Sequence, residues 1–330
     1  AYKISPTIFD KAIINLKNKK FINIIPSGKN YKLPTNSQGI IFIWREISNL
    51  CTRILYGLFF EKAWEVAFSK NLFNREINEP QDFIKIISSE QNNIKTLKIS
   101  KNYSFYADPF ILNSNIIVEG LNKYTYKGDL LLIDINSNSI IKKYNVKSKH
   151  LSYPYTKKFF GKNFIYPESG EQKNAILFSG KKSISLQKSS MNFKRGLIDP
   201  SVIEHDGLFY LFANYPNEEF VLRLWFSSTP YFNYVEEHQC SPILISPLGG
   251  RSGGRIFKIN DKIYRLGQDN TSDYGNGLIL FEITTLNREL FHEKKLLHHR
   301  FKGKRKGPHT FDFSSDLFTW DLYTERFNLF

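Results

Sequence analysis

The stretch FYADPFIL (residues 105–112) sets an aspartate and a proline ahead of an apolar run, and the chain repeats this arrangement as LIDPSVIE at residues 197–204. An aspartate before a proline is more often a turn residue than a catalytic one. Each stretch, however, continues into a tight turn and a second apolar run, which is the pattern of two paired strands. The stretches therefore raise the question of whether a repeated fold brings Asp108 and Asp199 to one place.

Three further segments share this pattern of strand, turn and strand. The five units begin at residues 107, 152, 198, 254 and 309, and they read ADPFILNSNIIVEG, SYPYTKKFFGKNFIYPESG, IDPSVIEHDGLFYLF, GRIFKINDKIYRLGQD and HTFDFSSDLFTWDLY. Pro109, Pro154 and Pro200 occupy the same position in the first three units. A period near 45 residues with about four strands per unit is typical of a β-propeller, in which each blade must stack on its neighbours to bury its faces.

Five units predict an all-β, five-bladed β-propeller over residues 64–330, and a β-sandwich is the alternative fold. The last unit is short of strands, while WEVAFS (64–69) and FIKIISS (83–89) precede the first unit. We therefore expect N-terminal strands to complete the last blade, which removes the exposed edge of an unclosed ring.

Residues 1–63 are expected to form a linker and an amphipathic helix that follow an upstream domain. The helix is predicted over residues 39–60 because apolar residues recur there at helical spacing: Ile40, Ile43, Trp44, Ile47, Cys51, Ile54, Leu55 and Leu58. Arg45, Glu46 and Arg53 interrupt the segment and argue against a membrane span. We expect the apolar face to pack on the propeller. A membrane surface is the alternative, because the region of Lys17–Lys20 is basic.

Composition favours a globular protein with an anionic partner. Lysine and arginine exceed aspartate and glutamate by 15, which suits phosphorylated sugars, nucleotides, nucleic acid or an acidic membrane surface. Nucleic acid is disfavoured because no binding module is recognisable. Two cysteines, Cys51 and Cys240, favour a reducing compartment. The expected location is the cytoplasm, with the inner membrane surface as a more specific alternative, and no cofactor or metal is predicted.

In a propeller the innermost strands run along a central channel, so residues in one register of the repeat gather at one mouth. The Asp108 register contains Tyr153, Asp199, Gly254 with Arg255, and His309. The partner strands contribute a second set: Glu119, Glu168, Asn214, Gln268, Asp269 and Asp321. Carboxylates, arginines and a histidine at one phase of a repeat are poor core material unless they share a cleft. The sequence therefore predicts a functional pocket.

This set of side chains suits carbohydrate chemistry. Polar side chains pair with sugar hydroxyls, aromatic rings cover sugar faces, and two carboxylates can act as acid and as base or nucleophile at a glycosidic bond. Arg251, Arg255 and Arg265 lie in or near the glycine-rich GGRSGGR segment and favour an anionic or nucleotide-linked sugar.

The residues ADPFI at 107 and IDPSVIEHDGLFYLF at 198 resemble the aspartate-bearing strands of five-bladed propeller glycosidases of the arabinanase and β-xylosidase type. The resemblance implies that Asp108 is the general base and that Asp199 tunes the acid. That family carries its general acid, a glutamate, just before a strand similar to GRIFKINDKIYRLG. Ser252 stands at the corresponding place here, so Glu168 or Glu119 would have to supply the acid from another blade.

A second resemblance covers more of the chain, from about Trp64 to Thr310. WEVAF, ADPFI, VEG, HLSYPY, PESGE, RSGGRIF, YRLGQD, DYGNG and GPHT together resemble the N-terminal propeller domain of plant glucosamine inositolphosphorylceramide transferases and of its relatives in bacterial surface-glycan proteins. This resemblance implies a role in glycoconjugate assembly, although the transferase activity of the plant proteins is credited to a separate domain.

The combined hypothesis is a carbohydrate-active propeller that handles an anionic sugar or sugar nucleotide in surface-glycan or glycolipid synthesis. Asp108 is the predicted base, Asp199 its electrostatic partner and Glu168 an acid or hydroxyl ligand. The predicted substrate-binding residues are Glu119, His150, Tyr153, Arg251, Arg255, Gln268, Asp269, Tyr274 and His309, of which Arg251, Arg255 and His309 would hold the anionic group. A non-catalytic glycan-binding module and a glycoside hydrolase are the alternatives.

Overall fold

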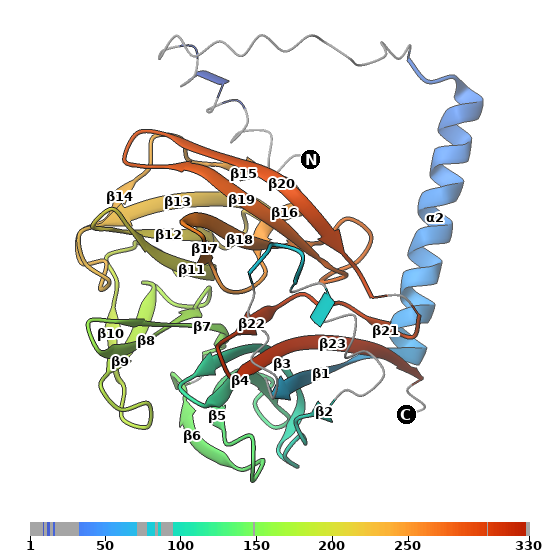
Figure 1. Cartoon of the computed structure of the whole chain (residues 1–330). Helices are drawn as coiled ribbons and strands as arrows, with labels where there is room; N and C mark the ends of the chain where they lie inside the picture. Colours follow the sequence, from blue (N-terminus) through green and yellow to red (C-terminus); the bar gives the residue numbers. More distant parts are fainter. Residues whose placement is uncertain are drawn as a thin grey trace. The chain divides into compact units, whose positions relative to one another are not determined.

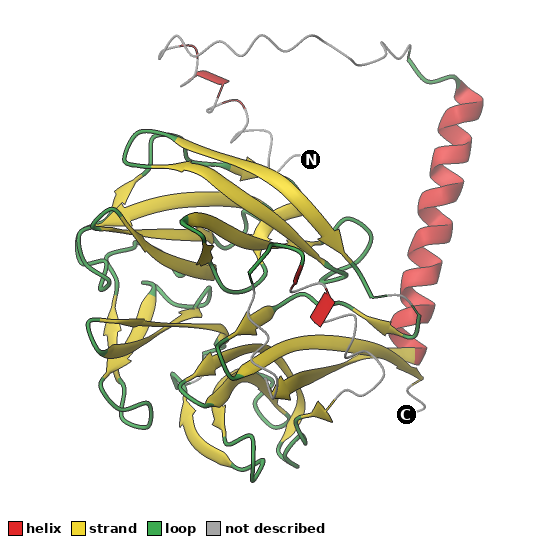
Figure 2. Ribbon diagram, viewed as in Figure 1, coloured by secondary structure: helices red, strands yellow, loops and turns green. Residues whose placement is uncertain are grey.

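The structure is a computed structural model that describes residues 33–70, 78–82, 85–86, 95–147, 149–301 and 303–327, together with residues 9, 12–13 and 16. It contains two compact units, one including Trp64–Tyr323 and the other including Ser5–Ala63 and Thr324–Phe330. Figure 1 shows the described elements in chain order, and Figure 2 shows that strands predominate.

The helix α2 spans Asn36–Phe59 and begins with a capping box. The Gln38 amide donates to the Thr35 hydroxyl, and the Thr35 amide donates to the Gln38 side chain at 2.9 Å, so two free amides of the first turn are satisfied. No residue of α2 is buried. The helix is therefore present as predicted. Among the described residues, no helix has the length and hydropathy to cross a bilayer, and the basic residues near Lys17 lie outside the described residues.

The larger unit consists of five antiparallel sheets, which confirms the predicted five-bladed propeller (Figure 1). Blade 1 contains β3 (Tyr103–Leu112), β4 (Asn115–Asn122), β5 (Gly128–Ile133) and β6 (Ile140–Tyr144). Blade 2 contains β7 (Ser152–Phe159), β8 (Lys162–Glu168), β9 (Ile176–Gly180) and β10 (Gln187–Ser190). Blade 3 contains β11 (Ile198–His205), β12 (Leu208–Asn214), β13 (Val221–Ser227), β14 (Glu236–Glu237) and β15 (Leu244–Ile245). Blade 4 contains β16 (Leu248–Ser252), β17 (Phe257–Ile259), β18 (Lys262–Asp269), β19 (Leu278–Leu286) and β20 (Phe291–His299).

Blade 5 combines the two ends of the propeller sequence. It contains β21 (Arg305–Lys306), β22 (Phe311–Phe313) and β23 (Leu317–Phe327) from the C-terminal side, and β1 (Phe60–Lys70) and β2 (Lys95–Thr96) from the N-terminal side. β1 pairs with β23, so the predicted closure by WEVAFS is confirmed. The expectation for FIKIISS is wrong where it can be assessed: Lys85 and Ile86 are helical, and the rest of that segment lies outside the described residues.

Aromatic side chains join each blade to the next, because a single sheet cannot bury both of its faces. Ring pairs with centroids 5.0 to 5.9 Å apart connect blades 1 and 2, 2 and 3, 3 and 4, and 4 and 5: Phe110 with Tyr155, Phe159 with Phe209, Phe212 with Phe291, and Phe257 with Phe313. One apolar cluster that includes Val66, Ile111 and Leu317 joins blade 5 to blade 1. The ring is thus continuous, and it holds the innermost strands side by side.

Candidate functional site

The innermost strands of blades 1, 2 and 3 carry the same backbone irregularity at the Asp108 register. Asp108, Tyr153 and Asp199 have φ values of +49°, +42° and +46°, and the strand pairing shifts at each of these positions. A left-handed residue at a bulge re-aims its side chain, and it costs about 1–3 kcal/mol in a residue with a side chain. The X-Pro pattern therefore marks a bulge within each strand. Tyr153 and Asp199 lie at the second position of β7 and β11, whereas Asp108 lies in the middle of β3.

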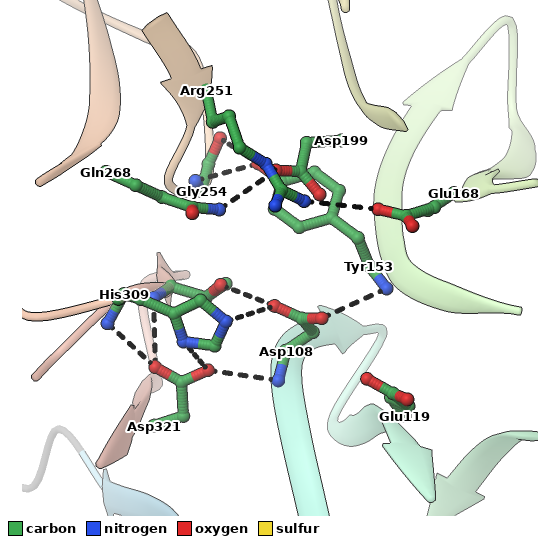
Figure 3. A network of polar contacts seen from close by, with 12 residues as sticks. Asp108, Glu119, Tyr153, Glu168, Asp199, Arg251, Gly254, Gln268, His309 and Asp321 are labelled. Atoms are coloured by element: carbon green, nitrogen blue, oxygen red, sulfur yellow. Dashed lines mark hydrogen bonds and ion pairs between the residues drawn. The ribbon is translucent and has the colours of Figure 1, made fainter. Parts of the chain in front are cut away.

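The Asp108 carboxylate belongs to a buried network with His309 and Asp321. The two ring nitrogens of His309 face the two carboxylates, with Nε2 lying 3.2 Å from Asp108 and Nδ1 lying 2.6 Å from Asp321. Asp108 also accepts hydrogen bonds from the Thr310 hydroxyl at 2.7 Å and from the Tyr153 amide at 3.3 Å. Figure 3 shows the imidazole between the two carboxylates. Strands β3, β7 and β23, from blades 1, 2 and 5, and the segment before β22 are thereby joined at one point.

The environment raises the pKa values of both Asp108 and His309. Burial raises the pKa of Asp108 to about 7, against the lowering effect of His309 and with help from Glu119 and Asp321. Burial lowers the pKa of His309, but the carboxylates of Asp321 and Asp108 outweigh it and raise that pKa to about 9. The imidazole is therefore protonated at neutral pH, and the raised pKa of Asp108 suits a group that exchanges a proton near that pH.

A second network links Arg251, Asp199 and Glu168. The Arg251 guanidinium donates to Asp199 at 2.7 Å and to Glu168 at 3.4 Å, and Figure 3 shows it between the two carboxylates. The Gln268 amide donates to the same Asp199 oxygen at 2.9 Å and to the Ser252 carbonyl at 2.8 Å. Asp199, from blade 3, is thus fixed by two side chains from blade 4 while Glu168 comes from blade 2.

The environment of Glu168 favours its protonated form. Burial raises the pKa of Glu168 well above its usual range, and the charge of the neighbouring Asp199 raises it further, while Arg251 acts in the opposite sense. The Glu168 side chain keeps 18% of its exposure, whereas that of Asp199 keeps 2%. Glu168 can therefore present a proton to a ligand while Asp199 remains paired with the guanidinium.

Glu168 and Arg251 open into a cavity of about 430 Å³, here called the mouth cavity. Its lining comes from blades 2, 3 and 4 and includes His150, Glu171, Asn214, Tyr215 and Glu219. The volume is in the range of small-molecule sites. Because Glu168 and Arg251 both line this cavity, a ligand bound there would contact the second network.

Two predicted ligand residues, His150 and Glu119, contact each other. His150 Nε2 lies 3.3 Å from Glu119, and this hydrogen bond raises the pKa of His150. Its Nδ1 accepts the Gly128 amide at 3.0 Å, so the ring as placed is the neutral tautomer that donates from Nε2. Glu119 also adds to the field that raises the pKa of Asp108.

Aromatic residues occupy different depths of the channel. Tyr153 is fully buried, and its hydroxyl accepts the Gly254 amide at 2.8 Å and contacts Ser201 at 3.1 Å. It therefore fills the channel instead of lining a sugar site as predicted. Tyr274 is 42% exposed, and its ring lies 5.4 Å from the Arg251 guanidinium. Tyr274 thus covers Arg251 from beside the mouth cavity, whose own aromatic lining residue is Tyr215.

Arg255 and Asp269, two of the predicted site residues, lie outside both networks and outside the mouth cavity. Arg255 makes a bidentate ion pair with the fully buried Asp312, whose other contact is the Ile111 amide at 2.7 Å. Asp269 is fully buried and accepts hydrogen bonds from Thr271, His298 and Arg300. Burial would raise the pKa of Asp269, but these hydrogen bonds lower it to about 2. Both residues hold structure together and do not reach the mouth cavity.

Asp321 is the residue whose importance the sequence did not reveal. The repeat places it on a partner strand, yet the sequence assigns it no function. In the structure its buried carboxylate accepts the amides of Asp108, His309 and Thr310 at 2.9 to 3.1 Å. The available signal was the stretch LFTWDLY, in which one aspartate interrupts an apolar strand, because a buried carboxylate requires dedicated partners.

Among the described residues, Asp108, His309 and Asp321 also form a group whose ligand atoms lie within 4.8 Å of one another. A metal-binding imidazole must offer an unprotonated nitrogen. Here both ring nitrogens face carboxylates, and the pKa of His309 is raised to about 9. The arrangement fits a shared-proton network better than a cation site.

The fold and the site define a five-bladed propeller whose channel mouth carries an excess of carboxyl groups. Residues 92–315 match the family described as "Glucosamine inositolphosphorylceramide transferase 1, N-terminal". The chain therefore belongs to this family, which confirms the second resemblance of the sequence analysis.

Individual relatives match parts of the chain. The proteins named glucosamine inositolphosphorylceramide transferase 1 from Oryza sativa subsp. japonica and Arabidopsis thaliana are 33% and 25% identical over 154 and 227 residues. These matches cover 44% and 63% of this chain but only 20% and 29% of the relatives.

Among solved structures, a thermostable family-43 glycoside hydrolase has 12% sequence identity and a TM-score of 0.45, covering 68% of this chain and 90% of its own. The GH43_1 enzyme from Xanthomonas citri complexed with xylose has 10% sequence identity and a TM-score of 0.46, covering 69% and 88%.

Proposed function

We propose that this propeller binds an anionic sugar or sugar nucleotide and acts on it by glycosyl-transfer chemistry during the synthesis of a surface glycan or glycolipid. The observation that carries the proposal is that Glu168, whose pKa is raised well above its usual range, lines the mouth cavity beside Arg251, which the buried Asp199 holds in place. Glu168 as acid and Asp108 as base would supply the two carboxyl groups that catalysis at an acetal carbon requires. The surplus of 15 positive charges supports the anionic character of the ligand.

The residues would act in distinct steps. Glu168 gives its proton to the leaving-group oxygen as the bond from that oxygen to the sugar breaks. Asp108, with a pKa of about 7, takes the proton of the acceptor hydroxyl as its oxygen bonds to the sugar. Asp199 keeps Arg251 in place and raises the pKa of Glu168, and the His309 imidazolium stabilises the ionised form of Asp108.

A two-stage experiment tests this proposal. Calorimetric titration with a panel of nucleotide sugars and neutral and anionic oligosaccharides identifies a ligand, and a product assay then measures turnover. Glu168→Gln keeps the size and hydrogen bonding of the side chain but removes the transferable proton, so we expect binding to persist and turnover to be lost. Unchanged turnover in both Glu168→Gln and Asp108→Asn would exclude the assigned roles.

A non-catalytic glycan-binding module is the second candidate, and one observation favours it. Ser252, at the position where the glycosidases carry their acid, is buried on β16, and its carbonyl accepts the Gln268 amide. Binding without turnover by the isolated chain would support this candidate. Release of reducing sugar from a synthetic aryl glycoside would instead support a hydrolase.

The proposed setting is the cytoplasm, with α2 in contact with the inner membrane surface and an upstream domain as partner. The apolar side chains of α2 support the membrane contact, since Ile43, Trp44 and Ile47 are 50% to 69% exposed. Co-sedimentation with vesicles of phosphatidylethanolamine and phosphatidylglycerol should be lost in Ile47→Asp. Equal sedimentation of the variant and the wild-type protein would remove this part of the proposal.

A further inference from the structure

A second cavity of about 430 Å³, here called the flanking cavity, adjoins the mouth cavity, because Tyr215 lines both. Its wall is formed by the loop before β11 and by β13. Phe193 and Trp225 are buried there, with ring centroids 5.3 Å apart. The cavity therefore has a rigid apolar base next to the proposed site of chemistry.

The charges around the two cavities differ in how completely they are paired. Among the described residues lining the mouth cavity, Arg251 is the only lysine or arginine, and Asp199 and Glu168 already hold its guanidinium. An anionic group entering there would have to displace a carboxyl group from Arg251. The mouth cavity is thus suited to sugar hydroxyl groups and poorly suited to an anion.

The lining of the flanking cavity contains three cations, one of them Arg223, and two carboxylates, so it has one cation in excess. Arg223 bonds to Glu218 and to Glu237, each at 2.8 Å, and offsets one of their two negative charges. Arg195 contacts Glu218 only at 4.0 Å, and its side chain is 61% exposed. Lys194 adds a second exposed cation to the lining.

Tyr215 holds the cations in position. The guanidinium groups of Arg195 and Arg223 lie 5.2 and 5.6 Å from its ring centroid, within the range of cation–π attraction. A stacked guanidinium keeps its N–H groups at its edge, where they can bind phosphate or carboxylate oxygens in pairs. Arg195 is thus oriented before any ligand arrives, which reduces the entropy lost on binding.

We propose that the flanking cavity is an anion subsite in which Arg195 and Lys194 bind a phosphate or carboxylate group carried by the carbohydrate whose sugar ring occupies the mouth cavity. The placement of the sugar ring rests on the proposed function, whereas the placement of the anion rests on the flanking cavity alone. It assigns the anionic group to a different place from the predicted one, since Arg251 and Arg255 are both occupied by carboxylates. A ligand that spans Tyr215 would then bind through its hydroxyl groups in the mouth cavity and through its anionic group in the flanking cavity.

The test compares Lys194→Gln/Arg195→Gln with Lys181→Gln/Lys182→Gln, which removes two exposed cations from the turn before β10 and so makes the same change in net charge. Each protein is applied to an array of neutral, uronate-bearing and phosphate-bearing oligosaccharides. We expect the wild-type protein and the control to prefer anionic glycans, and the Lys194/Arg195 variant to lose about tenfold or more in affinity for them while neutral glycans are unaffected. The array also separates a phosphate ligand from a carboxylate ligand.

A second measurement separates failure of this inference from failure of the proposed function. Pyrophosphate is titrated into the whole ¹⁵N-labelled chain, and the Arg195 Nε–H signal is assigned by its loss in Arg195→Gln. A saturable shift of this signal with no glycan bound on the array would support the subsite and overturn the carbohydrate function. Glycan binding with no preference for anions, or equal affinity in the Lys194/Arg195 variant, would overturn the subsite. A silent Arg195 signal would overturn it as well.

Discussion

The ratio of carboxyl groups to cations differs between two layers of the same channel. At the mouth, Asp108, Asp199, Asp321 and Glu168 surround two permanent or near-permanent cations, Arg251 and His309 (Figure 3). Three to four residues further along the chain, Arg255 meets Asp312 as a one-to-one bidentate pair. The balanced pair has no proton to give, whereas the mouth has more carboxyl groups than cations and must keep some of them protonated. An excess of one charge therefore distinguishes a chemical site from a structural ion pair.

The largest expected effect lies in the chemistry at the mouth. Glu168→Gln should reduce turnover of the identified carbohydrate by roughly 10²- to 10⁴-fold, the usual contribution of a general acid, with little change in affinity. Steady-state kinetics with separate kcat and KM values measure this. Glu236→Gln, an exposed residue of β14, is the matched control and should behave as the wild type. A loss confined to KM would assign Glu168 to binding alone.

The next effect concerns stability and should appear in the deeper layer. Arg255→Met leaves the Asp312 carboxylate buried without its partner, which typically costs about 3–5 kcal/mol, and ligand affinity should not change. Denaturant unfolding measures the free energy. Arg255→Met/Asp312→Leu should recover most of the loss, because it removes both buried charges. A single variant as stable as the wild type would show that the pair contributes little.

Arg251→Met is the corresponding change at the mouth, and it should have the opposite profile. The pKa of Glu168 is raised well above its usual range, so removal of the guanidinium exposes mainly the charge of Asp199. Asp199 keeps the hydrogen bond from Gln268 and the attraction of the His309 cation. We expect a smaller loss in the free energy of unfolding than for Arg255→Met, together with loss of turnover. If Arg251→Met were the more destabilising change and remained active, the distinction between the layers would fail.

The pH dependence of stability should reveal the shared protons. The pKa of His309 rises from 6.5 to about 9 in the folded state, so its contribution is complete below about pH 6.5 and is lost as the pH rises through 9. Asp108, raised from 3.8 to about 7, acts in the same sense over lower pH. Denaturant midpoints measured from pH 6 to 10 should fall with pH, and His309→Gln should flatten that fall. An unchanged slope in the variant would contradict the protonated ring.

The sequence predicted which residues of the repeat gather at the channel mouth, but it did not predict how far each side chain is buried. Five aligned units were sufficient to bring Asp108, Asp199 and His309 to one mouth, because innermost strands of a propeller are parallel to one axis. The bulges at Asp108 and Tyr153 could not be foreseen, since Asp-Pro and Tyr-Pro are also compatible with a regular extended strand.

Arg251 and Arg255 illustrate what spacing leaves open. Both lie in GGRSGGR, four residues apart, and both were assigned to an anionic ligand. A bulge between Leu248 and Ser252 and the left-handed Gly254, at φ +137°, separate them, so one meets Asp199 and the other Asp312. Which carboxylate each arginine finds depends on packing between blades, which no local pattern encodes.

The smallest predicted effect concerns Tyr274, whose ring covers Arg251 and His309 at the mouth. The Tyr274 ring lies 5.4 Å from the Arg251 guanidinium and 5.5 Å from the His309 ring, and the side chain is 42% exposed. Tyr274→Ala should lower the free energy of unfolding by about 0.5–1 kcal/mol, the usual size of an exposed cation–π contact, and it should weaken ligand binding by a comparable amount. Tyr274→Phe keeps the ring and should restore both quantities. Recovery of stability without recovery of binding would show that the ligand uses the tyrosine hydroxyl, and it would extend the mouth cavity toward the loop that carries Tyr274.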